Sequence, residues 1–291
     1  MEHLGTVAIV GVGLIGGSIG RALRARSLAD RIVGIGRREA ALEEARRLGA
    51  IDAGTTVLEQ GVAEADVVVV CTPVTSIAAD VCRVAGHGPE NLLVTDAGST
   101  KARIVAEVEA VPRGVATFVG AHPIAGSERS GVAAARADLL VNRTCVLTPT
   151  ARTPRDRLER ARQFWTLLGC RLVEMEPEAH DAALARTSHL PHAVAAALAA
   201  AVPAELLSLA AGGYRDTTRV AGSDPDLWTA IFLDNRQPVL TALADVQDEL
   251  ASFRRALEAG DDAWIRRWWA AARARRAGFD VPNPRPDREM P

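Results

Sequence analysis

Three short polar motifs interrupt otherwise apolar segments of this chain. They are Thr-Asp-Ala-Gly-Ser-Thr-Lys at 95–101, Gly-Ala-His-Pro-Ile-Ala-Gly-Ser at 120–127 and Ser-His-Leu-Pro-His at 188–192. The first two follow strand-like runs, and the carboxyl ends of parallel strands face the ligand crevice of an open sheet. We therefore expect these two motifs to contribute side chains to a site.

His122, in the second motif, carries an imidazole suited to general-base work near neutral pH. Its glycine and proline neighbours predict a short turn above the sheet, from which the ring can project into the crevice. The alternative is a structural histidine that fixes the turn.

His189 and His192, in the third motif, are three residues apart and share one face of the expected helix. They could line a site, cap or pack the helix, or bind a metal. Pro191 should bend this helix, which favours a shaped site over a plain core.

A glycine-rich loop opens the chain. Gly11, Gly13 and Gly16, with Leu14 and Ile15 between the last two, match G-x-G-x-x-G directly after a strand-like run and before a helical one. Such glycines permit a tight turn and a close approach to a pyrophosphate at the helix N-terminus. The loop predicts dinucleotide binding.

The residues after the second expected strand, 31–35, bear on the choice of cofactor. NAD-binding domains of this kind place an acid there for the ribose hydroxyls, but this chain has Gly36, Arg37 and Arg38. Two guanidiniums suit a 2′-phosphate, so NADP is favoured, with NAD as the alternative. The other explanation is two solvated arginines. Thr72 and Pro73, after the strand-like run 67–71, are assigned to the same cofactor site.

The elements that must position these residues alternate between strand and helix as far as residue 177. Strands, all expected to be buried, are predicted at 7–10, 31–35, 67–71, 92–95, 116–119, 144–147 and 172–175. Helices are predicted at 18–26, 39–48, 101–110 and 155–168. This pattern indicates a Rossmann-type parallel sheet covered on both faces.

After residue 178 the strand signals stop. Ala- and Leu-rich helical stretches follow at 181–201, 203–212, 225–259 and 262–277. We expect a dinucleotide-binding domain at 1–177, an all-α domain at 178–278 and a disordered tail at 279–291.

Composition excludes several classes. A net charge of −2 argues against a nucleic-acid binder, and no apolar run reaches the length of a membrane span. The four cysteines lack metal-ligand spacing and should be reduced core residues, and no metal site is expected. With no signal-peptide pattern, a cytoplasmic protein is expected.

Across residues 5–270 the chain resembles the prephenate/arogenate dehydrogenase family. The resemblance rests on the glycine loop at 11–18, the motifs at 96–101, 122–126 and 188–192, Gly-Tyr-Arg-Asp-Thr-Thr-Arg at 213–219 and Ser-Asp-Pro-Asp-Leu-Trp at 223–228. It implies oxidative decarboxylation of prephenate to 4-hydroxyphenylpyruvate in tyrosine biosynthesis, and a homodimer formed through the helical domain. The family's acidic ribose-binding residue is missing here.

The resemblance also implies residue roles. His122 would take the proton of the C4 hydroxyl as C4 passes its hydride to the nicotinamide, and Ser99 would hydrogen-bond the same hydroxyl and help orient His122. Arg219 would hold a substrate carboxylate, and Asp216 would orient Arg219 or a histidine. The remaining substrate-binding residues are His189, His192 and Trp228, which would line the pocket; Asp216 as a helix cap and Trp228 as a core aromatic are the alternatives.

Other functions stay open at this point. Arogenate, which would yield tyrosine directly, is the second substrate, although the pattern at 223–228 resembles prephenate-using relatives more. A β-hydroxyacid or imine reductase shares this architecture, but the hydroxyacid enzymes need a lysine on the helical domain, and Lys101 is the only lysine in the chain. A non-catalytic NADP sensor would not need His122, Ser99 and Arg219 together.

Overall fold

The computed structural model describes residues 3–126 and 129–279 of the 291-residue chain. Its contacts divide the chain into two compact units, residues 1–239 and 240–291. The predicted domain boundary at 177/178 lies inside the first unit and stays a prediction. Of the predicted tail, residue 279 ends a helix, and residues 280–291 lie outside the described residues.

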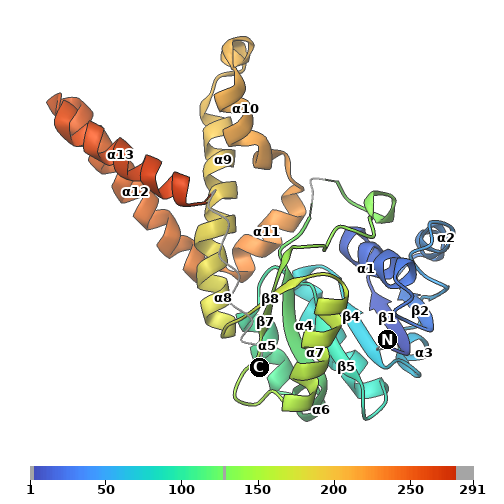
Figure 1. Ribbon diagram of the computed structural model, residues 1–291. Helices are drawn as coiled ribbons and strands as arrows, with labels where there is room; N and C mark the ends of the chain where they lie inside the picture. Colours follow the sequence, from blue (N-terminus) through green and yellow to red (C-terminus); the bar gives the residue numbers. More distant parts are fainter. Residues whose placement is uncertain (1–2, 127–128, 280–291) are drawn as a thin grey trace, which may run out of the picture. The chain divides into compact units, whose positions relative to one another are not determined.

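The first unit contains an eight-stranded sheet in the order β3-β2-β1-β4-β5-β6-β7-β8 (Figure 1). The strands are β1 (Thr6–Val10), β2 (Arg31–Ile35), β3 (Ala53–Thr55), β4 (Val67–Val70), β5 (Leu93–Asp96), β6 (Phe118–Pro123), β7 (Thr144–Thr148) and β8 (Arg171–Glu174). β3 was not predicted, because three residues are too few to show a period. The reversal of chain order at β1, between β2 and β4, opens a crevice for a ligand at the carboxyl ends of these strands.

The sheet is mostly parallel, which confirms the predicted Rossmann-type sheet, and one pair of its strands is antiparallel. β1 to β6 run parallel, β7 pairs antiparallel with β6, and β8 runs parallel to β7. β8 was also expected to be buried, yet Arg171 and Glu174 are exposed. As an edge strand it has a neighbour on one side only, and charged side chains there face water.

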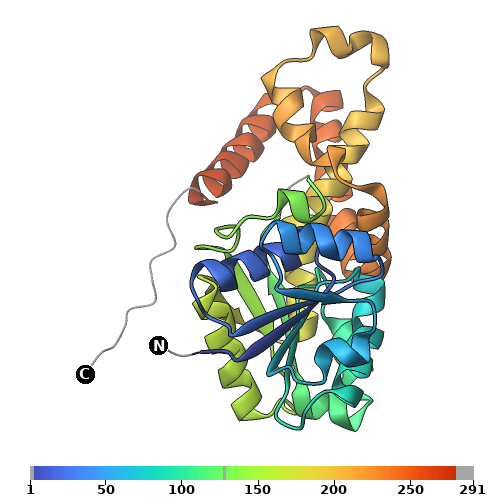
Figure 2. The ribbon, with the colours of Figure 1, turned by 90° about the vertical axis from the view of Figure 1, so that its right-hand side faces the viewer.

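Helices cover both faces of the sheet (Figure 2). One face packs against α1 (Leu14–Ala25), α2 (Glu39–Arg47) and α7 (Arg155–Leu167), and the other against α3 (Leu58–Val62), α4 (Val74–His87) and α5 (Ala102–Glu109). Side chains of β4 alternate between the two: Val67 and Val69 join the first core, Val68 and Val70 the second. This period of two explains the all-valine strand, which is buried on both sides. A short helix, α6 (Pro112–Thr117), ends where β6 begins, so the predicted strand at 116–119 started two residues early.

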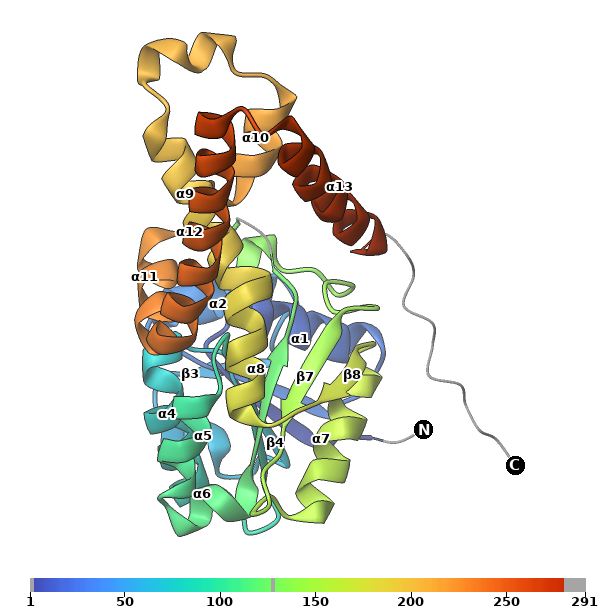
Figure 3. The same cartoon turned by 90° about the vertical axis from the view of Figure 1, so that its left-hand side faces the viewer.

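After β8 the chain is helical. The helices are α8 (Pro177–Leu184), α9 (Leu190–Ala201), α10 (Gly212–Thr218), α11 (Pro225–Asp234), α12 (Arg236–Ala259) and α13 (Asp262–Phe279). α8 lies beside α5 and β7 (Figure 3). The helix predicted at 225–259 is two helices, because the chain turns at Asn235, and most of the one predicted at 203–212 is a 3₁₀ segment, Ala204–Leu209.

The second unit contains most of α12 and all of α13. Its aromatic residues pack on one another: the Trp268 ring stacks on Phe253 at 4.9 Å and on Trp264 at 5.9 Å between centroids. Trp269 is two-thirds exposed. Trp264 and Trp268 therefore pack within this unit.

Two further features of the described chain are the state of its cysteines and the length and character of its helices. All four cysteines are free, with Cys145 and Cys170 buried and Cys71 and Cys82 half-buried. Within residues 3–126 and 129–279, no helix combines the length and apolar character that a membrane span requires.

Candidate active site

The glycine loop between β1 and α1 adopts the turn that its sequence predicts. Gly11 has φ +91°, and a Cβ there would stand 2.8 Å from the carbonyl oxygen of Cys71. A Cβ on Gly16 would stand 2.3 Å from the Gly11 carbonyl oxygen, so this glycine lets α1 pack closely on the loop. Gly13 has open space around it. Two glycines thus serve the turn and its packing, and the third leaves room for a ligand.

A cavity of about 520 Å³ lies beside this loop at the carboxyl ends of β1, β2 and β4. Six of the predicted cofactor residues line it: Gly11, Gly13, Arg37, Arg38, Thr72 and Pro73. Leu14, Ile15 and Gly16 belong to the first turn of α1 and do not line it.

The cavity fits a dinucleotide. No side chain caps the N-terminus of α1, so the amide groups of its first turn are available to an anion such as a pyrophosphate. Arg37 and Arg38 are exposed at the cavity, and their guanidiniums make no hydrogen bond or ion pair with any residue that the structure describes. No acid follows β2.

A second cavity, of about 510 Å³, collects most of the predicted catalytic and substrate residues. Ser99, His122, His189, His192, Arg219 and Trp228 line it. Asp216 does not. It lies exposed on α10, and because α10 ends at Thr218 and a 3₁₀ turn carries Arg219 toward the cavity, the two side chains make no contact within the described chain. The role predicted for Asp216, orienting Arg219 or a histidine, stays a prediction.

The loop that carries Ser99 is held by a buried ion pair. Lys101 and Asp96, both fully buried, bond through the ammonium and a carboxylate oxygen. Asp96 also accepts hydrogen bonds from the amides of Gly98 (2.9 Å) and Ala121 (2.9 Å). Asp96 thus ties the Ser99 loop to β6, the strand that carries His122. Lys101 itself does not line the cavity.

His122 is half-buried at the end of β6. Its Nδ1 lies 2.9 Å from Nε2 of His180, a residue that the sequence analysis did not single out. Ser99 lines the same cavity but makes no hydrogen bond to His122. Burial, aided by His180, Lys101 and His189, holds the pKa of His122 well below its usual value. The ring is therefore neutral at physiological pH, as a general base must be.

The third motif lies where the helix changes its winding. A π-helical segment, Ala185–His189, joins α8 to α9 and ends two residues before Pro191. Proline lacks an amide hydrogen and its ring clashes with the carbonyl four residues earlier, and a π-turn is a common way to absorb this. The disturbance of the helix that Pro191 predicts is this π-helical segment.

This winding brings both motif histidines against Trp228 of α11. The His192 ring stacks on the indole at 3.5 Å between centroids, and the His189 ring meets it edge-on at 5.9 Å. Nδ1 of His189 pairs with the amide nitrogen of Asn235 (3.0 Å), and burial lowers the pKa of His189 to about 4. Both rings therefore present neutral polar edges to the cavity.

Positive charge dominates the described wall of this cavity. Arg219, exposed, has no partner among the described residues. Burial, and to a smaller extent the nearby Arg219, lowers the pKa of His192. Arg129 and Arg143 also line the cavity, and sequence reasoning missed both because neither lies in a motif. Asp224, the acid among the described lining residues, caps α11 by accepting from the amides of Asp226 (2.8 Å) and Leu227 (3.2 Å). Such a wall suits an anionic ligand.

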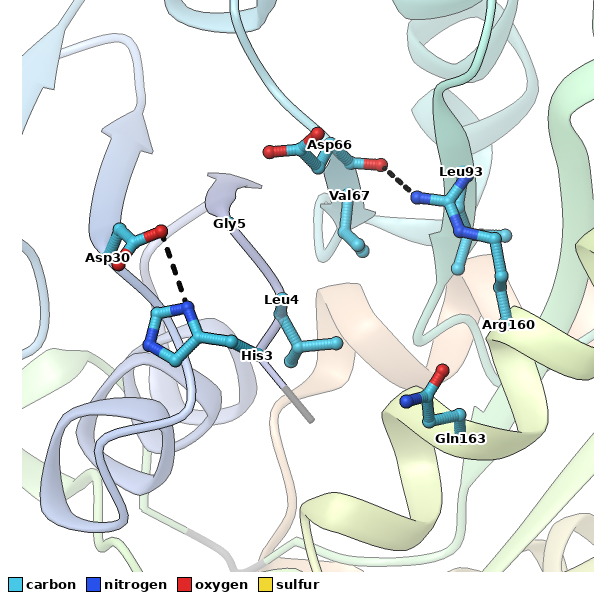
Figure 4. A pocket seen from close by; sticks show the side chains of 9 residues that line it. All are labelled: His3, Leu4, Gly5, Asp30, Asp66, Val67, Leu93, Arg160 and Gln163. Carbon is cyan, nitrogen blue, oxygen red and sulfur yellow. Dashed lines mark hydrogen bonds and ion pairs between the residues drawn. The ribbon is translucent and has the colours of Figure 1, made fainter. Parts of the chain in front are cut away.

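Another hollow, of about 380 Å³, lies at the opposite edge of the sheet (Figure 4). His3, Asp30, Asp66 and Arg160 are among its lining residues, and the Arg160 guanidinium donates to the Asp66 carbonyl oxygen (2.9 Å). It faces the amino ends of β1, β4 and β5, away from the glycine loop and His122. Ligands of open α/β sheets bind at the carboxyl ends, so this hollow is not the candidate site.

Fold and site together define a class: a nicotinamide-dependent dehydrogenase with a Rossmann sheet, a neutral histidine beside the cavity and a cationic pocket built partly by helices that follow the sheet. In the described part of the chain, no three His, Cys, Asp or Glu side chains gather as a metal site.

Comparisons with known proteins give the family. The family model for the prephenate dehydrogenase nucleotide-binding domain matches residues 19–174, and the model for its dimerization domain matches residues 176–270. Prephenate dehydrogenase of Bacillus subtilis is 36% identical over 283 residues, which cover 95% of this chain and 76% of that protein. The chain belongs to the prephenate dehydrogenase family.

Solved structures of similar proteins support the same family assignment. A crystal structure of prephenate dehydrogenase from A. aeolicus, in complex with hydroxyphenyl propionate and NAD⁺, matches with a TM-score of 0.88 and 32% identity over 96% of this chain and 99% of that one. Synechocystis arogenate dehydrogenase matches with a TM-score of 0.81 and 29% identity over 94% and 99%. The similar proteins thus include users of either substrate.

Proposed function

We propose that this enzyme oxidises prephenate to 4-hydroxyphenylpyruvate and carbon dioxide with NADP⁺. One observation carries the proposal: His122, a neutral base, and Arg219, a guanidinium without a partner in the described chain, face one cavity. Prephenate offers the matching groups, a hydroxyl on C4 and two carboxylates.

The residues divide the reaction between them. His122 takes the proton of the C4 hydroxyl, and the oxygen then forms a carbonyl as the C4 hydrogen leaves with its electron pair. The nicotinamide, when bound, accepts that hydride. The ring carboxylate departs as carbon dioxide, its electrons restore the aromatic ring, and His122 returns its proton to the phenolate oxygen. No metal ligand set is required at any point in this sequence.

The other residues of the cavity wall bind the substrate. Arg219 pairs with a substrate carboxylate, and Ser99 donates to the reacting oxygen. His189, whose Nδ1 is occupied by Asn235, presents Nε2–H to the cavity. Trp228, stacked on His192, gives the ring a flat apolar wall. Asp216 is left out of this set.

Charge favours prephenate over arogenate. The two differ by a keto or an ammonium group on the side chain, and an ammonium gains from a nearby free carboxylate. Arg143 and Arg219 line the cavity, and the carboxylate among its described lining residues, Asp224, is engaged with helix amides. A dianion therefore suits this wall better than arogenate, which carries a compensating positive charge.

Initial rates with each substrate and each cofactor test the proposal. We expect kcat/KM to be highest for prephenate with NADP⁺. A preference for arogenate would overturn the assignment of the substrate, and no turnover of either compound would revive a non-catalytic NADP-binding sensor.

We also propose a cytoplasmic homodimer. Large apolar side chains are exposed on helices of each unit, including Leu209 and Leu233 in the first and Leu257 and Trp269 in the second. The name of the matched dimerization domain points the same way, and four free cysteines suit a reducing compartment. Light scattering should give twice the mass of the chain.

A further inference from the structure

His180 and Asp181 lie behind His122, on the side away from the cavity. Both belong to α8 and are buried, and neither lines the cavity. With His122 they form a series of hydrogen-bonded side chains. Nδ1 of His122 lies 2.9 Å from Nε2 of His180, and Nδ1 of His180 lies 2.7 Å from Oδ1 of Asp181.

The direction of each hydrogen bond in this series of three side chains follows from its last member, Asp181. Asp181 is held at the start of α5, where Oδ1 accepts from the Lys101 amide (2.8 Å) and Oδ2 from the Ala102 amide (2.9 Å). Both oxygens are acceptors, so the carboxylate has no hydrogen to offer His180. Nδ1 of His180 must therefore donate to Asp181.

A neutral histidine that donates from one nitrogen accepts at the other. Nε2 of His180 therefore accepts, and its partner, Nδ1 of His122, donates. This leaves Nε2 of His122 without a hydrogen. The lone pair that a general base needs is on the nitrogen not engaged by His180.

We propose that His180 and Asp181 are positioning residues that hold His122 in the tautomer with a hydrogen on Nδ1 and a lone pair on Nε2. An imidazole in free solution prefers the opposite tautomer, so His122 needs a buried acceptor at Nδ1. A carboxylate behind a catalytic histidine has this effect in serine proteases. Here a second imidazole stands between the carboxylate and the base.

Among the charged and titratable groups that the structure describes near His122, none other than His180 is a partner of Nδ1. The charged and titratable groups around the ring are the Lys101–Asp96 ion pair beneath the loop, His189 on the π-helical segment, and the pair on α8. Lys101 is an ammonium paired with Asp96, and His189 pairs with Asn235. The same Asn235 nitrogen donates to the Asp181 carbonyl oxygen (2.8 Å), which links the two histidine positions through α8.

A purely structural role is the competing explanation. His180 and Asp181 also join α8 to α5, so their loss could lower stability without changing His122. The two explanations differ in the state of one nitrogen, which can be measured directly in the protein without substrate.

Nitrogen-15 NMR of the histidine side chains provides that measurement. The chain has six histidines, and the His122 signals are those lost in His122→Asn. We expect Nδ1 of His122 to carry the hydrogen in the wild-type protein and Nε2 to carry it in a substantial fraction of His180→Phe. A hydrogen on Nε2 in the wild-type protein, or an unchanged tautomer in His180→Phe, overturns the proposal.

The kinetic consequence rests on the proposed function. His180→Phe should lower kcat about 10- to 100-fold, part of what a general base contributes, and change each KM less than about threefold. His180→Gln, whose amide oxygen can accept from Nδ1 of His122, should recover much of the loss.

Thr117→Val is the matched control. Thr117 is buried far from the cavity and donates to the Arg113 carbonyl oxygen (2.8 Å), so this variant loses a buried hydrogen bond but should keep its kcat. A kcat for His180→Phe equal to that of Thr117→Val would refute a positioning role. If the wild-type protein showed the expected tautomer but turned over neither substrate, the proposed function would fail and the tautomer assignment would stand.

Discussion

The two arginines after β2 give the sharpest test of cofactor choice. In the double variant Arg37→Ala/Arg38→Ala, the wall of the dinucleotide cavity loses both guanidiniums that could meet a 2′-phosphate. Neither has a partner in the described chain, so their removal leaves no buried group unsatisfied and should not affect folding. Only cofactor binding, and the kinetic constants that depend on it, should change.

The magnitude follows from exposure. A hydrogen bond to a charged group contributes about 1.5–3 kcal/mol, and because both side chains are exposed the lower end applies. Two such contacts sum to about 3 kcal/mol, or roughly a 100-fold change in an equilibrium constant. Since neighbouring contacts are not additive, we expect kcat/KM for NADP⁺ to fall between about tenfold and 100-fold relative to NAD⁺.

Steady-state rates at saturating prephenate and fixed ionic strength measure this ratio. Arg47→Ala is the matched control, because Arg47 is exposed at the end of α2 but does not line the cavity. The double variant should lose NADP⁺ efficiency while NAD⁺ efficiency changes little, and Arg47→Ala should leave both unchanged. Equal losses for the two cofactors would show that these arginines are solvated surface charges.

Three further predictions concern the substrate cavity. His122→Asn should keep cofactor affinity and lower kcat by roughly 10²- to 10⁴-fold, and turnover near that of the wild type would make His122 structural. Arg219→Ala should raise KM for prephenate about tenfold or more at nearly unchanged melting temperature, with part of the loss recovered in Arg219→Lys, because the lost carboxylate contact is present in both ground and transition states; a large stability loss with an unchanged KM would contradict this. The pKa of His189 is about 4 in the folded protein and near 6.5 when unfolded, so the unfolded chain binds the proton first as pH falls. Stability should therefore decrease from pH 6.5 to 4, by up to about 3 kcal/mol from this residue, and urea unfolding of His189→Gln should show a correspondingly smaller decrease.

Much of the cofactor site was predictable because its causes are local. The turn at Gly11 requires a positive φ, and the close packing of α1 on the loop requires a glycine at position 16. Both requirements fall on residues close together in the sequence, so the motif shows them. The arginines at 37 and 38 were predicted to face the ligand for the same reason: the end of β2 leads directly to them. Leu14 and Ile15 were assigned from the motif alone, and a motif does not distinguish residues that line a cavity from residues that only complete its helix.

The substrate site mixes local and distant causes. Ser99 and His122 follow strands that end at one edge of the sheet, which period-two patterns predict. Arg143 lies before β7, and its place in the cavity depends on that strand running antiparallel to β6. Strand direction is decided by the route of the connecting chain, which leaves no mark in the alternation of apolar residues.

The sequence by itself determined the Rossmann pattern, the phosphate loop, the lack of an acid directly after β2 and the place of His122 at the end of a strand, because each depends on residues adjacent in the chain or on a period within one element. Tertiary structure alone decided the partners of those residues. His180 lies 58 positions from His122, and a histidine near the start of a helix has no sequence pattern that distinguishes a surface residue from one behind a catalytic ring. Asp216 and Arg219 show the converse: three residues apart, they separate because the helix ends between them. Hydrogen bonds depend on distance and direction in space, and those are set only once α8 has packed against α5 and β7.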